Sequence, residues 1–503
     1  MLGCSVNLSH SSAVVVIRNA PFISERAVRA ASGLYVGGSW REGPGRMTVI
    51  DPATGAPVGE VVAASTNDAS EAVAAAHAAF PAWAALSPDE RGQPLRRAHE
   101  LVLDRAGELA RALTLEGGKP LPEAEGEVLW GAEFLLWYAE EIRRPWGEIL
   151  AAGGPSQRLY VRRRPRGVVA CITPWNFPSS MVTRKLAPAV AAGNTVVLKP
   201  AEQTPLSAVL LFEIFDEAGF PPGVVNLVCG EPAAIGEVFT RTPEVRQLSF
   251  TGSAAVGRML AERCARAGKK ASLELGGHAP FVVFADADLE LAAEKLTFSK
   301  LQNAGQTCIA ANRVLVERPA LERLGALLGE RLRAARVGDG MQDGVTVGPL
   351  IDARAVAKVS AHIDDALARG ARALCGGGAV DGLDPERFVA PTILAGVPLD
   401  SRIATEETFG PVAPLIPFDA EHEAVALANA SEYGLAAYLF TRDLGRAHRV
   451  GEALDYGMVA INDGALGWVQ APFGGVKGSG DAREGGRLGL EDYLDVQYLS
   501  VNF

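Results

Sequence analysis

Residues 167–198 read GVVACITPWNFPSSMVTRKLAPAVAAGNTVVL, and this stretch decides the fold class. It begins and ends with short, uninterrupted apolar runs at 167–172 and 195–198, and a helix-length segment separates them. Strands that are apolar on both faces are typical of a parallel sheet covered by helices on both sides. The stretch therefore predicts a strand–helix–strand unit of a doubly wound α/β domain.

The same alternation of short apolar runs and helix-length segments continues towards both ends of the chain. Apolar runs of strand length follow at 224–228, 247–250, 271–275, 281–284, 313–317, 412–418 and 458–462. Helical patterns precede the first run and lie near 68–80, 91–115 and 123–143. Because the runs form one series before residue 277 and another after residue 280, the sequence predicts an α/β protein with two tandem doubly wound parallel-sheet domains.

Two further segments have the alternation of half-exposed strands. Residues 158–162 read RLYVR, and the C-terminal tail 493–503 alternates in the same way. We expect the two segments to pair into a small exposed sheet. Since an exposed sheet edge invites pairing with another chain, this sheet is a candidate oligomerisation element, with a plain surface hairpin as the alternative.

Composition excludes several classes of protein. The chain has 503 residues, 48% of them apolar and 21% charged, with a formal net charge of −11. The acidic balance argues against a nucleic-acid binder, and the lack of an apolar stretch of about 18 residues argues against a membrane span. The six cysteines are widely spaced, which predicts neither a metal site nor a disulfide framework and favours a cytoplasmic location. They are Cys4, Cys171, Cys229, Cys264, Cys308 and Cys375.

Three residues are candidates for catalysis. Cys308 follows Gly-Gln-Thr in a turn, Glu274 stands near the end of an apolar strand, and Asn176 lies in a turn between two prolines. An exposed thiol is a potential nucleophile, and a carboxylate at a strand end lies where ligands bind to parallel sheets. The alternatives are a packed cysteine, a solvated carboxylate and an asparagine that bonds its own turn.

Two strand ends have the features of a dinucleotide site. Lys199 and Glu202 follow the strand 195–198, while Gly252 and Ser253 form a turn that enters a helix. The free amide groups of such a helix start favour a phosphate. The usual GxGxxG motif is absent, so each segment alone is a weak indication.

In this order the segments resemble the aldehyde dehydrogenase superfamily, from about residue 33 to the C-terminus. The shared motifs are PWNFP at 174–178, FTGS at 250–253, ELGG at 274–277, GQTC at 305–308 and EETFGP at 406–411. Within the superfamily, MVTRK at 181–185 and APFGGVKGSG at 471–480 resemble NAD(P)-dependent succinate-semialdehyde dehydrogenases most.

The resemblance implies a role for each matching residue. Cys308 is expected to be the nucleophile, Asn176 to bind the oxyanion and Glu274 to activate water. The cofactor, NAD, is expected to contact Trp175, Lys199, Glu202, Gly252, Ser253, Glu407 and Phe409. Because a carboxylate at residue 202 accepts a 2′-hydroxyl but repels a 2′-phosphate, we expect NAD⁺ to be preferred over NADP⁺.

The substrate implied is a small semialdehyde, succinate semialdehyde being favoured. Arg184 and Ser479 match positions that bind the distal carboxylate, but Gln302 stands where the subfamily has a second arginine. Neutral aliphatic or aromatic aldehydes therefore stay open as substrates, and a cysteine esterase or hydrolase is the alternative of another class. Glu484 matches a proposed proton relay, and Lys185 receives no role.

The resemblance also suggests domain bounds and an assembly. We expect residues 1–32 to be a poorly ordered extension, 33–146 with 167–276 to bind NAD, and 277–465 to form the catalytic domain. Residues 147–166 and 485–503 are the expected oligomerisation element of a homodimer or homotetramer.

Overall fold

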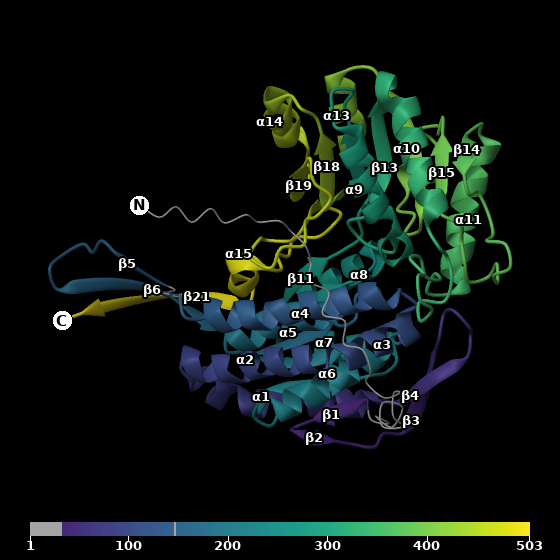
Figure 1. Ribbon diagram of the computed structural model, residues 1–503. Helices are drawn as coiled ribbons and strands as arrows, with labels where there is room; N and C mark the ends of the chain where they lie inside the picture. The colour runs from purple at the N-terminus through teal and green to yellow at the C-terminus, as the bar shows by residue number, and fades with distance from the viewer. Residues whose placement is uncertain (1–32, 145–146) are drawn as a thin grey trace, which may run out of the picture.

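The computed structural model describes residues 33–144 and 147–503, and Figure 1 shows two α/β bodies with a small sheet that projects from one of them. The extension predicted at 1–32 lies outside the described residues, and so does Cys4. Across the described parts of the chain, no helix is both long and apolar enough to cross a membrane.

The first body contains a seven-stranded sheet in the order β11-β10-β7-β8-β9-β1-β2. Its parallel strands are β7 (Val168–Ile172), β8 (Thr195–Lys199), β9 (Val225–Val228), β10 (Val245–Thr251) and β11 (Lys270–Glu274). They coincide with the predicted apolar runs. Two short strands that the apolar pattern did not indicate, β1 (Leu34–Val36) and β2 (Ser39–Trp40), extend the sheet in antiparallel orientation.

Helices cover both faces of this sheet. One face packs against α2 (Pro88–Asp104), α3 (Ala106–Gly117), α4 (Leu121–Glu141), α5 (Ser180–Ala191) and α6 (Leu206–Glu217). The other packs against α1 (Thr66–Ala85), α7 (Pro232–Arg241) and α8 (Ala254–Arg266). The helical pattern at 91–115 forms two helices because Arg105 leaves helical geometry, with φ −103° and ψ 16°.

The second body has a seven-stranded sheet in the order β14-β15-β16-β13-β12-β18-β19. Its strands are β12 (Ala279–Val283), β13 (Ala311–Glu317), β14 (Arg372–Cys375), β15 (Thr392–Ala395), β16 (Val412–Phe418), β18 (Ala436–Phe440) and β19 (Met458–Ile461). Only the edge strand β14 is antiparallel to its neighbour within this described sheet. Its helices are α9 (Leu289–Leu301), α10 (Leu321–Ala334), α11 (Ala353–Ala368), α13 (Glu421–Asn429) and α14 (Leu444–Ala453). The two-sheet α/β prediction is thus confirmed.

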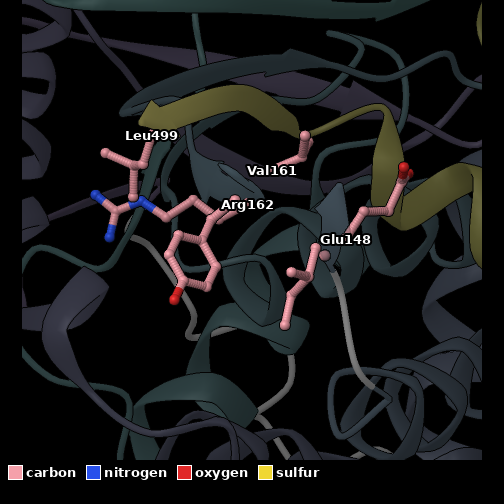
Figure 2. Close-up of a pocket in the computed structure, with 7 residues that line it drawn as sticks. Glu148, Val161, Arg162 and Leu499 are labelled. Carbon is pink, nitrogen blue, oxygen red and sulfur yellow. The ribbon is translucent and has the colours of Figure 1, made fainter. Parts of the chain in front are cut away.

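The projecting sheet consists of β5 (Gly147–Leu150), β6 (Gln157–Pro165) and β21 (Leu494–Asn502), as Figure 1 shows. The chain therefore pairs the two alternating segments that the sequence singled out, in antiparallel register from Leu494 opposite Pro165 to Asn502 opposite Gln157. A hollow of about 350 Å³ lies on this sheet, and Figure 2 shows the side chains that line it. It is lined by Gly147, Glu148, Ile149, Tyr160, Val161, Arg162 and Leu499.

The remaining elements are short. They are the hairpin β3 (Gly45–Ile50) and β4 (Pro57–Ala63), the pair β17 (Tyr433–Gly434) and β20 (Val476–Lys477), the helices α12 (Arg402–Thr405) and α15 (Gly486–Glu491), and the 3₁₀ turns η1 (Gln302–Gly305) and η2 (Arg318–Ala320). The turn η1 lies between α9 and β13, directly before Cys308.

Candidate active site

The loop that carries Cys308 begins with an unusual turn. Asn303 (φ 49°), Ala304 (φ 54°) and Gly305 (φ 74°) are consecutive left-handed residues. Left-handed geometry costs a residue such as Ala304 about 1–2 kcal/mol, so surrounding contacts must hold the turn. Beyond it Cys308 is partly exposed, whereas Cys171, Cys229 and Cys264 are buried. Cys308 is thus the cysteine of this group that a substrate can reach.

Asn176 connects this loop to the first sheet. It lies after β7, is buried, and its side-chain Nδ2 donates to the main-chain oxygen of Gln306 at 3.0 Å. In return, Nδ2 of Asn303 donates to the main-chain oxygen of Asn176 at 2.9 Å. These two hydrogen bonds bring the predicted oxyanion residue next to the loop of the predicted nucleophile.

Glu274 is the last residue of β11 and lies close to the same loop. A Cβ on Gly277 would come within 2.3 Å of the main-chain oxygen of Cys308, so only glycine allows this approach. The Glu274 side chain is buried, and neither carboxylate oxygen has a hydrogen-bond partner among the described residues. Burial, followed by the charge of Glu484, raises the pKa of Glu274 well above its ordinary value. A carboxylate whose pKa is raised binds a proton more tightly than an ordinary one, as a general base requires.

Glu484 has the opposite environment. Lys185 Nζ lies 2.7 Å from its Oε1, and Arg184 Nη2 lies 2.9 Å from its Oε2. Burial opposes its ionisation, but these two cations outweigh that effect and lower the pKa of Glu484. Lys185, which received no role from the sequence, is therefore a counter-ion. The sequence feature that could have indicated this role is the pair of adjacent cations on α5, a helix whose residues are all buried.

Arg184 lies in an aromatic box. Its guanidinium carbon is 4.2 Å from the ring centre of Phe473, 5.3 Å from that of Trp130 and 5.4 Å from that of Phe134. The side chain is 1% exposed, and within the described chain its Nε and Nη1 have no hydrogen-bond partner. Buried donors without partners are costly, so these nitrogens are suited to bind an anionic group.

The thiol of Cys308 is not ionised by its surroundings. Although part of the residue is accessible, the surrounding protein atoms desolvate the thiol, and this burial raises its pKa to about 12; the charges of Glu274, Glu407 and Glu484 act in the same direction, while Arg184 opposes them. Because a thiolate is the reactive form, the proton must be removed by a base. Glu274 is the neighbouring carboxyl group whose pKa is raised and whose oxygens have no hydrogen-bond partner in the described structure.

The predicted cofactor residues lie at strand ends of the first sheet and on the loop from 406 to 411. Lys199 ends β8, and its Nζ lies 3.5 Å from Oε2 of Glu202. Gly252 and Ser253 connect β10 to α8, where Ser253 caps the helix through Val256 N. Thr251 Oγ1 is buried and lacks a hydrogen-bond partner within the described chain. The amide groups that start α8, together with this polar atom, fit the pyrophosphate of a dinucleotide.

Glu407 and Phe409, the residues expected to contact the nicotinamide ribose and ring, are each held by contacts within the protein. Oε1 of Glu407 accepts a hydrogen bond from Gly277 N at 2.9 Å. Phe409 has a positive φ of 59°, and its ring meets Trp175 edge-on at 5.6 Å. Glu407 therefore lies beside the turn that follows Glu274, which joins the expected cofactor site to the expected catalytic site.

Ser479 and Gln302, two of the residues expected to bind the substrate, differ in burial and in their hydrogen bonds. Ser479 is fully buried, and its hydroxyl donates to Gly276 O at 2.8 Å and accepts from Gly434 N at 3.0 Å. The hydroxyl therefore supports the turn after Glu274 through these two main-chain groups. Gln302 directly follows α9 as its C-cap residue and is partly exposed, and its main-chain oxygen accepts a hydrogen bond from Thr307 Oγ1 at 3.4 Å.

Three charged residues that the sequence analysis did not single out form hydrogen bonds to the main chain of the loops that carry Asn176 and Cys308. Lys119 pairs with Glu127, and its Nζ also donates to the main-chain oxygen of Asn176 at 2.7 Å. Glu127 accepts from Ser179 N at 2.9 Å and Ser180 N at 3.1 Å. Glu123 accepts from Asn303 N at 2.8 Å. The run EAEGE at 123–127 was the available signal, because it places acidic residues on a helix with many buried positions.

Known proteins match this chain over nearly its whole length. The profile of the "Aldehyde dehydrogenase family" matches residues 40–499. The chain belongs to the aldehyde dehydrogenase family. Like its relatives in this family, it is an oxidoreductase that acts on aldehydes.

Its relatives include semialdehyde dehydrogenases. A succinate-semialdehyde dehydrogenase of Escherichia coli, whose name specifies NADP⁺, is 50% identical over 90% of this chain and 94% of the relative. A glutarate-semialdehyde dehydrogenase of Pseudomonas putida is 48% identical over 93% of this chain and 97% of the relative. The crystal structure of succinate-semialdehyde dehydrogenase from Burkholderia pseudomallei superposes with a TM-score of 0.94 at 46% identity, covering 96% of this chain and 100% of that one. The resemblance to this subfamily is thus confirmed.

Proposed function

We propose that the protein oxidises a small semialdehyde, succinate semialdehyde being favoured, to the carboxylic acid with NAD⁺ as cofactor. The observation that carries this proposal is the convergence of Cys308, Asn176 and Glu274. Asn176 is hydrogen-bonded to Gln306, two residues before the thiol, and the turn after Glu274 abuts the main chain of Cys308. This convergence supports a mechanism in which a nucleophile, an amide donor and a base act on one carbonyl carbon.

The first step forms a covalent bond. Glu274 accepts the proton of the Cys308 thiol, and the sulfur attacks the carbonyl carbon while the π electrons move to the carbonyl oxygen. Nδ2–H of Asn176 and the main-chain N–H of Cys308 stabilise the resulting negative charge. When bound, NAD⁺ supplies the acceptor for the hydride that leaves the thiohemiacetal carbon.

The second step is hydrolysis of the thioester that remains on Cys308. After Glu274 has released the thiol proton to solvent, it accepts a proton from water, the water oxygen attacks the acyl carbon, and the carbon–sulfur bond breaks. The acid leaves, and the sulfur regains its proton for the next turnover. Both proton transfers require a Glu274 side chain that no other group binds tightly.

The decisive experiment follows NADH absorbance at 340 nm with an aldehyde and NAD⁺. Wild-type protein is expected to form NADH, and Cys308→Ala is expected to lose at least about 10³-fold in kcat. A cysteine hydrolase would form no NADH and would need an imidazole base. His278 is poorly suited to that role, because it is buried, its Nε2 lies 3.3 Å from Ile403 O and its pKa is well below the ordinary value.

The distal part of the substrate is expected to bind Arg184. The free Nε and Nη1 suit a carboxylate, and the relatives named for succinate and glutarate semialdehyde act on aldehydes with this group. Arg184→Met is expected to raise KM for succinate semialdehyde about 10- to 100-fold, as loss of a charge-assisted hydrogen bond predicts. KM for butyraldehyde is expected to change less than threefold. Equal damage to both aldehydes would contradict the proposal.

Variants of Gln302 and Ser479 allow the same comparison between acidic and neutral aldehydes. Because Gln302 is neutral, Gln302→Arg is expected to lower KM for succinate semialdehyde and to leave KM for butyraldehyde unchanged. Ser479→Ala removes a hydroxyl that bonds only main-chain groups in the described structure. It is therefore expected to affect acidic and neutral aldehydes alike, in contrast to the role that the resemblance implied.

The preference for NAD⁺ rests on Glu202. Its side chain is 43% exposed beside Lys199, so it can accept a hydrogen bond from a ribose hydroxyl, and its charge opposes a 2′-phosphate. Glu202→Ser is expected to raise kcat/KM for NADP⁺ at least about tenfold relative to NAD⁺. An unchanged ratio of the two values would contradict this assignment. The relative from Escherichia coli that is named for NADP⁺ is a suitable control enzyme.

We further propose a cytoplasmic homodimer or homotetramer that assembles through the projecting sheet. In the described chain, β5 pairs with β6 on one side only, and its Ile149 is 75% exposed. An apolar, unpaired edge favours a second copy of the same strand. Light scattering is expected to give a mass of two or four chains, and Ile149→Glu is expected to shift it towards one.

A further inference from the structure

The turn before Cys308 has polar contacts on several sides. Asn303 donates its side-chain amide to Asn176 O, and its own oxygen accepts from Gln306 N and Gln306 Nε2, both at 3.0 Å. Gln306 Oε1 in turn accepts from Ile351 N at 2.9 Å. The remaining main-chain group of Asn303, its N–H, donates to Glu123 Oε2 at 2.8 Å.

This last contact joins two distant parts of the chain. Glu123 stands in the first turn of α4, 180 residues before Asn303 in the sequence, and α4 packs on the first sheet. The hydrogen bond therefore fixes the start of the Cys308 loop to a helix of the other body. It acts on the residue where the chain enters left-handed geometry.

We propose that Glu123 is a positioning residue, which holds the left-handed turn at 303–305 and thereby keeps Cys308 and Gln306 O in register with Asn176. The inference rests on the proposed role of Cys308 as nucleophile. It concerns the protein's own geometry, because Glu123 acts through Asn303 and not on the substrate.

Charge makes Glu123 an effective acceptor. Burial raises its pKa to about 7, Glu127 adds to this effect, and the Asn303 amide and Lys119 act against it. At pH 8 most molecules therefore carry the carboxylate, and a hydrogen bond to a charged acceptor is about twice as strong as a neutral one. Lys119 and Glu127 are bonded to each other and to the segment 176–180, so they tie the second loop to the same helix.

The test compares four variants of the full-length protein at pH 8. Glu123→Ala removes the acceptor, Glu123→Asp withdraws the carboxylate by one methylene, and Glu123→Gln keeps an acceptor of the same length. Glu125→Ala is the matched control, because Glu125 is exposed on the same turn of α4. The readouts are kcat, KM for NAD⁺, and hydrogen–deuterium exchange of the peptide that contains residues 302–308.

We expect Glu123→Ala to lower kcat about tenfold and to speed exchange of the loop about tenfold, as loss of one hydrogen bond to a charged group predicts. Glu123→Asp is expected to do the same by at least about threefold, and Glu123→Gln to stay within about threefold of wild type. KM for NAD⁺ is expected to stay within about twofold in all variants, since the cofactor residues lie elsewhere. Glu125→Ala is expected to match the wild type.

The proposal is overturned if Glu123→Asp matches the wild type in both kcat and exchange, a result that decides the question even where Glu123→Ala does not fold. It is also overturned if Glu123→Gln is as impaired as Glu123→Ala. If the wild type forms no NADH from any aldehyde, the proposed function fails instead, and the exchange rates still decide the role of Glu123.

Discussion

Two buried acids of the same site, Glu274 and Glu484, have opposite environments. Glu484 is held by Lys185 and Arg184, and its pKa is lowered. Glu274 has no hydrogen-bond partner in the described structure, and its pKa is raised well above the ordinary value by burial and by Glu484 itself. Burial is common to both, so the counter-ions make the difference.

The comparison shows how one fold keeps an ionised carboxylate, Glu484, beside a carboxyl group that can gain and lose a proton, Glu274. A paired carboxylate is a poor proton acceptor, because protonation breaks its ion pairs. An unpaired one accepts a proton readily, and the neighbouring fixed charge favours the neutral form further. The structure thus supports Glu274 as the base and Glu484 as the group that adjusts it.

The largest expected effect comes from removing the free acid. Glu274→Gln is expected to lower steady-state kcat about 10²–10⁴-fold, since the glutamine cannot accept a proton. Because the thiol proton must also be removed, the pre-steady-state burst of NADH is expected to slow as well. Stopped-flow absorbance at 340 nm measures both phases. A variant with wild-type turnover would end the assignment of Glu274 as base.

Removing the fixed acid is expected to affect folding more than chemistry. Glu484→Gln leaves Arg184 and Lys185 buried without their counter-charge, and loss of one partner of a buried pair typically costs about 3–5 kcal/mol. The expected result is a lower urea midpoint of unfolding. The kcat limb that reports Glu274 is expected to move to lower pH, because the charge that raises its pKa is gone. Arg487→Gln, an exposed charge on α15, is the control for the midpoint.

The smallest effect concerns stability against pH. Because the pKa of Glu274 is raised in the folded protein, folding binds its proton more tightly, and this stabilisation is complete below about pH 4.5. It is lost as pH rises through the folded pKa. Glu274→Gln carries no such group, so its Tm relative to wild type is expected to increase as pH rises from about 4.5 through the folded pKa of Glu274. A difference that is constant with pH would contradict the raised pKa.

Much of the fold could be predicted from the sequence, because buried parallel strands are continuous apolar runs. The runs at 167–172 and 195–198 became β7 and β8, adjacent and parallel. Strands β1 and β2 were missed, since strands of three and two residues are too short to carry a periodic pattern. The split of the helix pattern at Arg105 was missed as well, because helical periodicity continues across it.

The segments of the candidate site could be predicted where motifs mark them, whereas the long-range contacts between side chains could not. Cys308, Asn176 and Glu274 lie in recognisable segments, and the structure brings those segments together. Ser479 lies in a matching motif too, but its hydroxyl binds Gly276 and Gly434, which only the folded chain brings near. Glu123 could not be found, because its partner Asn303 is 180 residues away.

The amide of Asn176 has one more consequence. It has two N–H bonds, and one of them is directed at Gln306 O. If the amide were flipped, its oxygen would face the Gln306 oxygen, and the two would repel each other. The amide group therefore has a single orientation, and its second N–H bond points in a fixed direction. In the proposed mechanism this N–H therefore faces the carbonyl oxygen already oriented, and stabilising the charge requires no rearrangement at the moment of bond formation.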